Sequence, residues 1–196
     1  MQGASSSTWR EIWETVRAIV IAVIIALLVR QFVVETYQVD GISMEPTLQN
    51  GERLLVNKFI YDFESPHVGQ IIIFHPPVPG VKVDYVKRVI ALPGQTFFVK
   101  DGQVFINGQL LPEPWEPKSW LGDFTGSEFI GGSTSDCPGP LPVNNQPITI
   151  PPGHIWVLGD HRLVSTDSRC FGPVPISSIK GMVMLIWWPF PNFRVF

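Results

Sequence analysis

A serine in a punctuated turn and a lysine on an apolar strand face are the residues of this chain that could do covalent chemistry together. Ser43 lies in the run DGISMEPTLQNG, residues 40–51. Gly41 permits close backbone approach or a positive φ before it, and Pro46 fixes the backbone after it. A serine hydroxyl is protonated at neutral pH and needs a nearby base to become a nucleophile. Such punctuation also occurs in ordinary turns, so Ser43 is a catalytic candidate only if a base can reach it.

Lys87 is the candidate base. The stretch VKVDYVKRVIAL alternates, and a period of two places Val81, Val83, Tyr85 and Lys87 on one face of a strand. A lysine on such a face usually marks an edge strand or a head group that reaches solvent. If the lysine is buried instead, desolvation lowers its pKa and the neutral amine can accept a proton. A shift from about 10.4 to the range of 7 to 8 costs on the order of 4 kcal/mol, which only a functional site is expected to bear.

A dense polar segment follows an apolar strand near the C-terminal end. In GDHRLVSTDSRCFGPV the polar residues include Asp160, Arg162, Ser165, Asp167, Ser168 and Arg169. A solvated loop seldom begins at the end of an apolar strand and closes with Phe-Gly-Pro. Ion pairing such as that of Asp167 with Arg169 would fix this segment against the core.

Short strands and turns must position these residues. The 19 prolines and 17 glycines, with Val, Ile and Phe in short runs, favour a mainly β body. We predict strands over residues 32–39, 53–58, 70–74, 81–92, 154–160 and 181–188. The dipeptides Asp101-Gly102 and Asn107-Gly108 predict two successive hairpins. Residues 112–147 carry Pro, Gly, Ser and isolated aromatics without a period, so we interpret them as an irregular excursion and not a domain.

The N-terminal residues predict a helix, with a capping box at Thr8-Trp9-Arg10-Glu11. The apolar run Ala18–Val29 alone rises only about 18 Å, which suits a core helix or a signal peptide as well as a membrane segment. Extended over residues 16–34 it reaches about 28 Å and spans, provided that Arg17 and Arg30 reach the two interfaces.

The residues after the apolar run are not the small residues that a processing site needs. We therefore predict an uncleaved transmembrane anchor within residues 1–35 and a β-rich domain over residues 36–196. The charges that flank the run nearly balance, so its orientation does not follow from them. Aromatic residues from Trp187 to Phe196 could touch lipid headgroups or pack in the core.

Composition excludes some classes of function. The net charge of −3 and the absence of a lysine or arginine cluster argue against nucleic acid as a partner. Cys137 and Cys170 are the two cysteines, in no metal-ligand spacing, and we expect no metal and no cofactor. They could form a disulfide outside the cytoplasm or remain two free thiols.

The order of the motifs resembles that of bacterial type I signal peptidases. An apolar N-terminal segment is followed by GISMEPTL, RLLVNK, DYVKRVIALPG, GDHRLVSTDSR and FGPVP, from about Glu11 to Phe196. The resemblance implies an antiparallel β-body behind one transmembrane helix. It also implies a serine-lysine dyad at the outer face of a cell membrane, or of a thylakoid membrane if the source has one. The implied partners are the lipid bilayer and the signal peptides of exported preproteins, which the family cleaves after small-x-small sequences.

The same resemblance implies roles for individual residues. Ser43 corresponds to the nucleophile, Lys87 to the general base and Ser165 to a serine that hydrogen-bonds and orients the lysine. Asp167, Arg169 and Arg88 correspond to an ion-paired group that stiffens the site. A preprotein segment is expected to add as a strand beside residues on both sides of the cleft, namely Val39, Asp40, Ile42, Asp84 and Tyr85.

Two positions depart from the family pattern. Some members carry a second serine two residues before the nucleophile as an oxyanion donor, where this chain has Gly41. The oxyanion hole must then use backbone N–H groups, for which Ser43 and Gly41 are the candidates. The usual NRDN after Gly-Asp is replaced by HRLV at residues 161–164, which changes the side chains available to that loop.

Two other readings are open. A self-cleaving repressor-type protease shares the serine-lysine chemistry, but it carries a DNA-binding helical domain before the serine, where this chain has about forty residues of membrane character. A membrane-tethered β-domain without catalysis would be expected to lose Ser43 or Lys87, and neither is lost.

Overall fold

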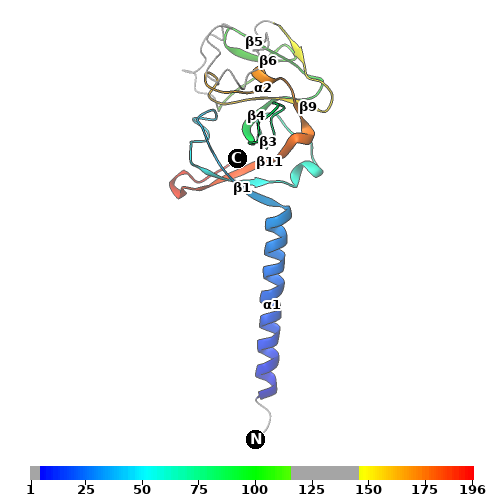
Figure 1. Ribbon diagram of the computed structural model, residues 1–196, viewed down its shortest axis with the longest axis vertical. Helices are drawn as coiled ribbons and strands as arrows, with labels where there is room; N and C mark the ends of the chain where they lie inside the picture. Colours follow the sequence, from blue (N-terminus) through cyan, green and yellow to red (C-terminus); the bar gives the residue numbers. More distant parts are fainter. Residues whose placement is uncertain (1–4, 116–145) are drawn as a thin grey trace.

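A long helix and a β-rich body make up the computed structural model, which describes residues 5–115 and 146–196, without the side chains of residues 5–8, 26 and 28–32. Helix α1 (Ser5–Phe32) extends away from the body as a single rod (Figure 1). It begins at Ser5, three residues before Thr8, so the capping box predicted at Thr8-Trp9-Arg10-Glu11 lies inside the helix and is wrong as its start.

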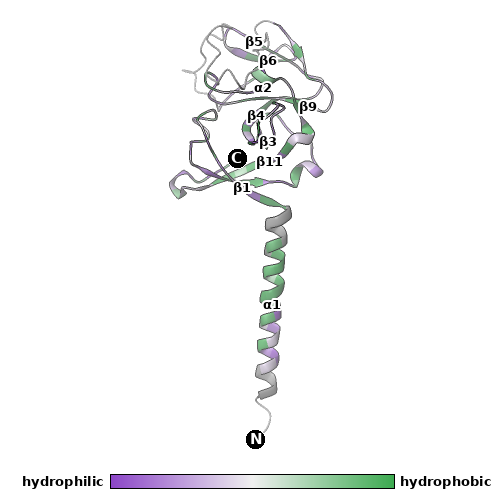
Figure 2. Cartoon of the chain, viewed as in Figure 1, coloured by the Kyte–Doolittle hydropathy of each residue, from purple (hydrophilic) through white to green (hydrophobic). Residues whose placement is uncertain are grey.

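Hydrophobic residues dominate the middle of α1 (Figure 2). Within the part of the chain that the structure describes, none of the helices, α1 included, combines the length and the hydropathy that crossing a membrane requires.

The larger sheet of the body is antiparallel throughout and carries eight strands among the described residues. Its order is β1 (Val34–Gln38), β2 (Arg53–Asn57), β11 (Ile179–Trp188), β3 (Ile71–Phe74), β4 (Tyr85–Ala91), β9 (His154–Leu158) and β10 (Val174–Pro175), and β12 (Arg194–Val195) pairs with β11. The six predicted strands are confirmed, and the antiparallel, mainly β class is confirmed with them.

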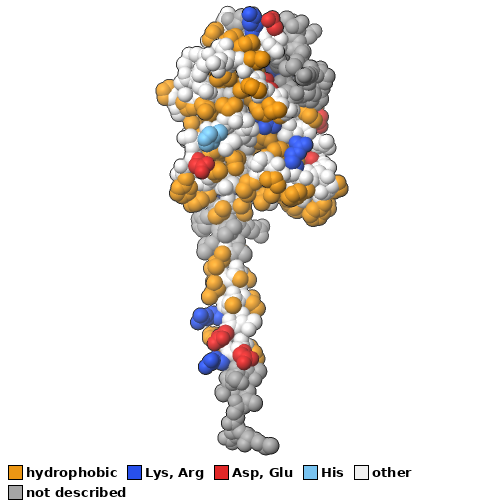
Figure 3. Space-filling model, turned by 180° about the vertical axis from the view of Figure 1, so that it is seen from behind, with side chains coloured by type: hydrophobic (Ala, Val, Ile, Leu, Met, Phe, Trp, Pro, Cys, Tyr) orange, Lys and Arg blue, Asp and Glu red, His pale blue; other side chains and the backbone are white. Residues whose placement is uncertain are grey.

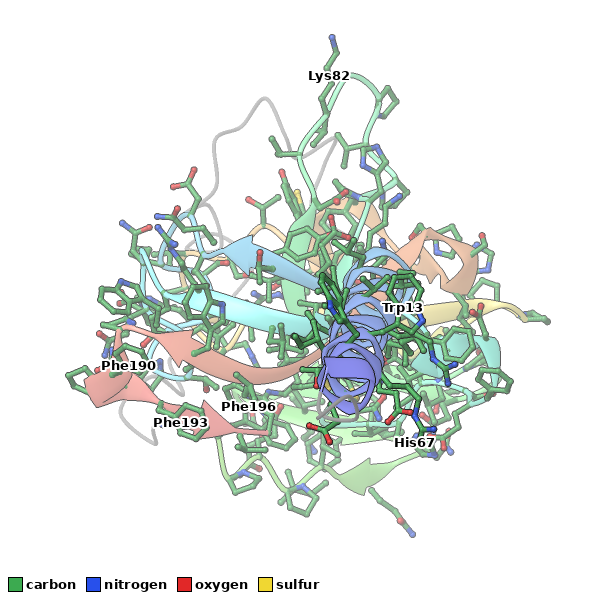
Figure 4. All side chains as sticks on the ribbon, turned by 90° about the horizontal axis from the view of Figure 1, so that it is seen from below. Trp13, His67, Lys82, Phe190, Phe193 and Phe196 are labelled. Atoms are coloured by element: carbon green, nitrogen blue, oxygen red, sulfur yellow. The ribbon has the colours of Figure 1, made fainter. Side chains whose placement is uncertain are left out.

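The predicted strand at 81–92 begins four residues late, at Tyr85. Tyr85, the first residue of β4, pairs with Phe74, the last residue of β3. The loop between these two residues contains prolines, which cannot donate the hydrogen bonds that would extend the pairing. Val83 is accordingly 63% exposed, and Lys82 lies at the tip of this loop (Figure 4).

The smaller sheet has the order β7 (Gln109–Leu110), β6 (Gln103–Ile106), β5 (Thr96–Lys100) and β8 (Ile148–Thr149). Both predicted hairpins are confirmed. Asp101 and Asn107 adopt positive φ, as do the glycines that follow them, which is the geometry that Asp-Gly and Asn-Gly turns favour. Phe97 of β5 stacks on Trp156 of β9, so the two sheets share one core.

Among the described residues, the strands are connected by helix α2 (Ser168–Phe171) and by the short helical segments η1 (Ile60–Asp62), η3 (Ile176–Ser178) and η4 (Phe190–Asn192). Most of the predicted excursion, residues 116–145, lies outside the described residues, and so does Cys137. Cys170, on α2, is disulfide-bonded.

Candidate active site

Ser43 lies in the turn that follows β1. The turn is closed by backbone hydrogen bonds from Val39 N to Glu52 O and from Gly51 N to Val39 O, at 2.8 and 2.9 Å. Met44 and Leu48 are 1% and 0% exposed, so both sides of the turn are fixed in the core. The serine itself stays half-buried at the surface of this anchored segment.

Lys87 meets Ser43 from the neighbouring part of the sheet. It lies on β4 opposite Ile72 of β3, and its side chain is directed to the turn. Lys87 Nζ lies 2.7 Å from Ser43 Oγ and donates to Val86 O at 3.0 Å. The residue is 4% exposed, which excludes the reading of a lysine whose head group reaches solvent.

Burial lowers the pKa of Lys87 from 10.5 to about 8. Removal of water from the ammonium is the largest cause, and Arg169 lowers the pKa further. Asp167 and Asp160 act in the opposite direction and raise it, without offsetting the effect of burial. A substantial share of Lys87 is therefore neutral near pH 8 and able to accept the proton of Ser43.

Two buried ion pairs support the dyad. Asp167 accepts from Arg169 Nε and Nη2, both at 2.8 Å, and from the backbone N–H of Gly159 at 3.0 Å. These donors hold the pKa of the Asp167 carboxyl below its usual value, against the effect of burial. Arg88 instead pairs with Asp160 through Nε and Nη2, at 2.8 and 2.6 Å. The resemblance implied one ion-paired group of Asp167, Arg169 and Arg88. In the structure Asp167 pairs with Arg169, and Arg88 forms a separate pair with Asp160.

Ser165 is 5% exposed and lies on the same loop. Its hydroxyl makes no hydrogen bond of normal geometry with any described residue, although it is near enough to Asp167 to lower the pKa of that carboxyl. The hydrogen bond from Ser165 to Lys87 that the family pattern implies is not formed in this structure.

A cavity of about 350 Å³ opens beside the dyad. One wall is formed by the residues that lead to Ser43, including Val39, Asp40 and Ile42, and the other by Asp84 to Lys87. Val164 and Thr166 line it as well. All five residues expected beside the substrate strand, Val39, Asp40, Ile42, Asp84 and Tyr85, therefore line this one cavity.

Gly41 corrects one expectation about the oxyanion hole. Its φ of 105° lies in the region that favours glycine, as expected, but its N–H donates to Asn50 Oδ1 at 3.0 Å. That N–H is therefore engaged within the turn. The N–H of Ser43, by contrast, has no backbone or side-chain acceptor among the described residues.

The chain matches the family described as signal peptidase, peptidase S26, over residues 12–188. It belongs to this family.

Similar signal peptidases cover nearly the whole chain. Signal peptidase IB of Staphylococcus aureus strain COL is 37% identical over 188 residues, 94% of each chain. The probable signal peptidase I-1 of Synechocystis is 36% identical over 191 residues, 93% of this chain and 86% of that protein. A crystal structure of a signal peptidase I from Enterococcus faecalis is 31% identical and covers 61% of this chain and 97% of its own, with a TM-score of 0.45.

This candidate site contains contacts that sequence reasoning missed. An added side chain at Gly159 would come within 2.5 Å of Ser165 Cβ and would also overlap Ser165 Oγ and Ser43 O. Asp160 and Arg162 are 0% and 1% exposed, and Arg162 forms an ion pair with Glu113. Arg162 was visible as part of the polar segment, but no sequence signal linked it to Glu113.

The replacement of NRDN by HRLV leaves the loop attached to the nucleophile. His161 N donates to Ser43 O at 3.1 Å, and Arg162 Nε donates to Gly159 O at 2.9 Å. Val164 contributes to the cavity wall, while Leu163 is 39% exposed. Backbone hydrogen bonds and one buried arginine thus hold this part of the loop.

Proposed function

We propose that this protein is a membrane-anchored serine endopeptidase that removes signal peptides from exported preproteins after small-x-small sites. The observation that carries the proposal is the contact of 2.7 Å between Lys87 Nζ and Ser43 Oγ, in a buried setting that lowers the pKa of the lysine to about 8. An amine in this position can act as a base at a pH where an ordinary lysine cannot.

The reaction follows from the positions of these groups. Neutral Lys87 removes the proton of Ser43 Oγ as the oxygen attacks the scissile carbonyl carbon, and the resulting ammonium gives that proton to the leaving amine. The acyl-enzyme that remains is hydrolysed by a water molecule that Lys87 deprotonates. The negative oxygen of each tetrahedral intermediate needs a fixed donor. The N–H of Ser43, which has no acceptor among the described residues, supplies one.

Positioning residues keep the two reacting atoms together. Gly159 provides the space in which Ser165 and the Ser43 carbonyl pack, and His161 N holds that carbonyl. Asp167 and Arg169 brace the loop beside the lysine, while Arg88 and Asp160 tie β4 to the same loop. Ser165 makes no hydrogen bond to Lys87 in this structure, so we do not assign it the orienting role that the family pattern implies.

The preprotein is proposed to bind as an extra strand between the two walls of the cavity. On β4, pairing with β9 begins only at Arg88, so the edge at Val86 and Lys87 has no partner strand on that side among the described residues. An extended peptide can hydrogen-bond to such an edge. Leu54, Ile73 and Val86 give the cavity apolar surface, which is compatible with short apolar side chains next to the cleaved bond.

The membrane anchor rests on the apolar run Ala18–Val29 and on the exposed hydrophobic side chains along α1, such as Ile19, Val20 and Ile24. Hydrophobic side chains also gather along the edge of the body from which α1 leaves (Figure 3). Phe190, Phe193 and Phe196, 69%, 57% and 41% exposed, lie on the side of the body away from Lys82 (Figure 4) and could touch lipid headgroups. The disulfide at Cys170 favours an extracytoplasmic location for the body, at a cell or thylakoid membrane.

The test is cleavage of a purified preprotein with an Ala-x-Ala site by the full-length protein in detergent or lipid. We expect Ser43→Ala and Lys87→Met each to abolish cleavage, whereas the matched surface changes Ser177→Ala and Lys180→Met leave it intact. Circular dichroism establishes that each variant is folded. Cleavage by both dyad variants would reject the mechanism, and cleavage of the protein's own chain but no preprotein would favour a self-processing protease.

A further inference from the structure

The cleft contains a carboxylate that the proposed reaction does not use. Asp84 lines the same cavity as Ser43 and precedes Lys87 by three residues. At the rise of an extended chain this separation corresponds to about 10 Å, or about three residues of a peptide bound alongside. Asp84 is thus too far from Ser43 to take part in bond cleavage, but it faces the peptide that is cleaved.

Asp84 is held in place and remains accessible. Its Oδ1 lies 3.2 Å from His75 Nδ1, and the two side chains are 24% and 46% exposed. Histidine compensates this charge only when it is protonated. Asp40, on the opposite wall, has no ion pair with any described residue.

The electrostatic influence of Asp84 extends into the cavity. Tyr37, which lines the cavity, has a pKa raised to about 12, mainly by burial and then by the charges of Glu35 and Asp84. Glu35 is compensated by Lys58 at 3.2 Å. Among the described residues that line the cavity, Lys87 is the single lysine or arginine, and it is buried at the catalytic end and reacts as the neutral amine.

Among the described residues that line the cavity, a bound peptide therefore meets two carboxylates and no exposed lysine or arginine. The acyl part of the substrate must stay bound while water attacks the acyl-enzyme, so the cavity holds residues that precede the cleaved bond. We infer that Asp84, held by His75, makes the enzyme select preproteins with a lysine or arginine side chain two to five residues before the cleaved bond. This inference rests on the proposed function.

The experiment measures kcat/KM for a set of peptides with a constant Ala-x-Ala site. Lysine, glutamine or glutamate is placed in turn at the second, fourth and fifth residues before the cleaved bond. At one of these positions we expect the wild type to prefer lysine over glutamine by about three- to tenfold at low salt, and less at high salt, because the pair is partly exposed. In Asp84→Asn the preference is expected to vanish, while the glutamine peptide is still cleaved.

Asp62→Asn is the matched control, because it removes one carboxylate from η1, outside the cavity, and it should keep the wild-type preference. His75→Gln replaces the ring with a neutral amide that can still donate to Asp84 and leaves the carboxylate in place, so its lysine preference should equal or exceed that of the wild type. If Asp84→Asn cleaves no peptide at all, the lysine preference of His75→Gln becomes the test. A lysine preference lower than that of the wild type would overturn the inference.

Equal rates for lysine and glutamine at every position, or a preference that survives Asp84→Asn, would also overturn it. These results leave the proposed function intact as long as wild type, and not Ser43→Ala, cleaves the glutamine peptides. No cleavage of any peptide by the wild type would instead reject the proposed function itself.

Discussion

Replacing Lys87, the proposed base, should make the protein more stable at neutral pH while it abolishes the proposed activity. Lys87 is 4% exposed and its pKa falls from 10.5 to about 8 on folding. At about 1.36 kcal/mol per pKa unit, the folded state loses about 3 kcal/mol through the buried ammonium. Lys87→Met fills a similar volume without the charge. The variant loses the hydrogen bonds to Ser43 Oγ and Val86 O, which costs it about 1 kcal/mol. Its free energy of unfolding at pH 7 should therefore exceed that of the wild type by about 2 kcal/mol.

The sign of the pH dependence follows from the two pKa values. Below pH 8 the lysine is protonated in both states, and the folded state bears the full cost of the buried charge. Between pH 8 and 10.5 the unfolded chain keeps a proton that the folded protein releases, so the wild type gains stability as the pH rises. By pH 9.5 the advantage of Lys87→Met should have fallen below about 0.5 kcal/mol.

The assay is urea unfolding of full-length wild type and Lys87→Met in the same detergent at pH 7 and pH 9.5. At pH 7 the variant's thermal midpoint should also rise, by about 4 to 8 °C for a protein of this size. Lys180→Met, at an exposed position, controls for the loss of a positive charge and should leave the midpoint unchanged at both pH values. A less stable Lys87→Met at pH 7, or an equal difference at both pH values, would refute the reasoning.

Three further changes probe the supporting structure. Gly159→Ala forces Ser165 and the Ser43 carbonyl apart, so kcat/KM should fall more than about tenfold with a loss of about 1 to 3 kcal/mol in unfolding free energy. Gly80→Ala has open space at its Cβ but a φ of 86° that strains alanine, so it should lose stability and still keep normal activity. Asp160→Asn leaves buried Arg88 without its carboxylate and should destabilise by about 3 to 5 kcal/mol in urea unfolding, against at most about 1 kcal/mol for Glu35→Gln at the exposed pair with Lys58. Mass spectrometry of the denatured, unreduced protein after alkylation should find no modified cysteine, and two modified cysteines would contradict the disulfide at Cys170.

The two residues of the proposed dyad could be predicted from the sequence because both lie in local patterns. Ser43 follows a strand and sits between a glycine and a proline, and alternation placed Lys87 among apolar residues. Whether that lysine was buried could not be settled from alternation, because a strand face is equally apolar at an edge. The structure decides it through the turn at Ser43, which covers the amine.

Other parts of the site depend on contacts between distant segments. Asp167 and Arg169 are two residues apart, and their pairing was predicted. Asp160 pairs with Arg88 across 72 residues, and no local pattern reveals which carboxylate meets which arginine. The hydrogen bond from the Gly41 N–H to Asn50 depends on how the turn brings Asn50 back, so it could be found only in three dimensions.

The pH dependence of kcat/KM for an uncharged Ala-x-Ala peptide tests most directly whether neutral Lys87 is the base. With a pKa of about 8 in the free enzyme, log kcat/KM should rise with unit slope from pH 6 and level off above pH 8. The value at pH 6 should be about one hundredth of the plateau. A flat profile from pH 6 to 10, or a rise that continues to the pKa of an ordinary lysine, would contradict the account.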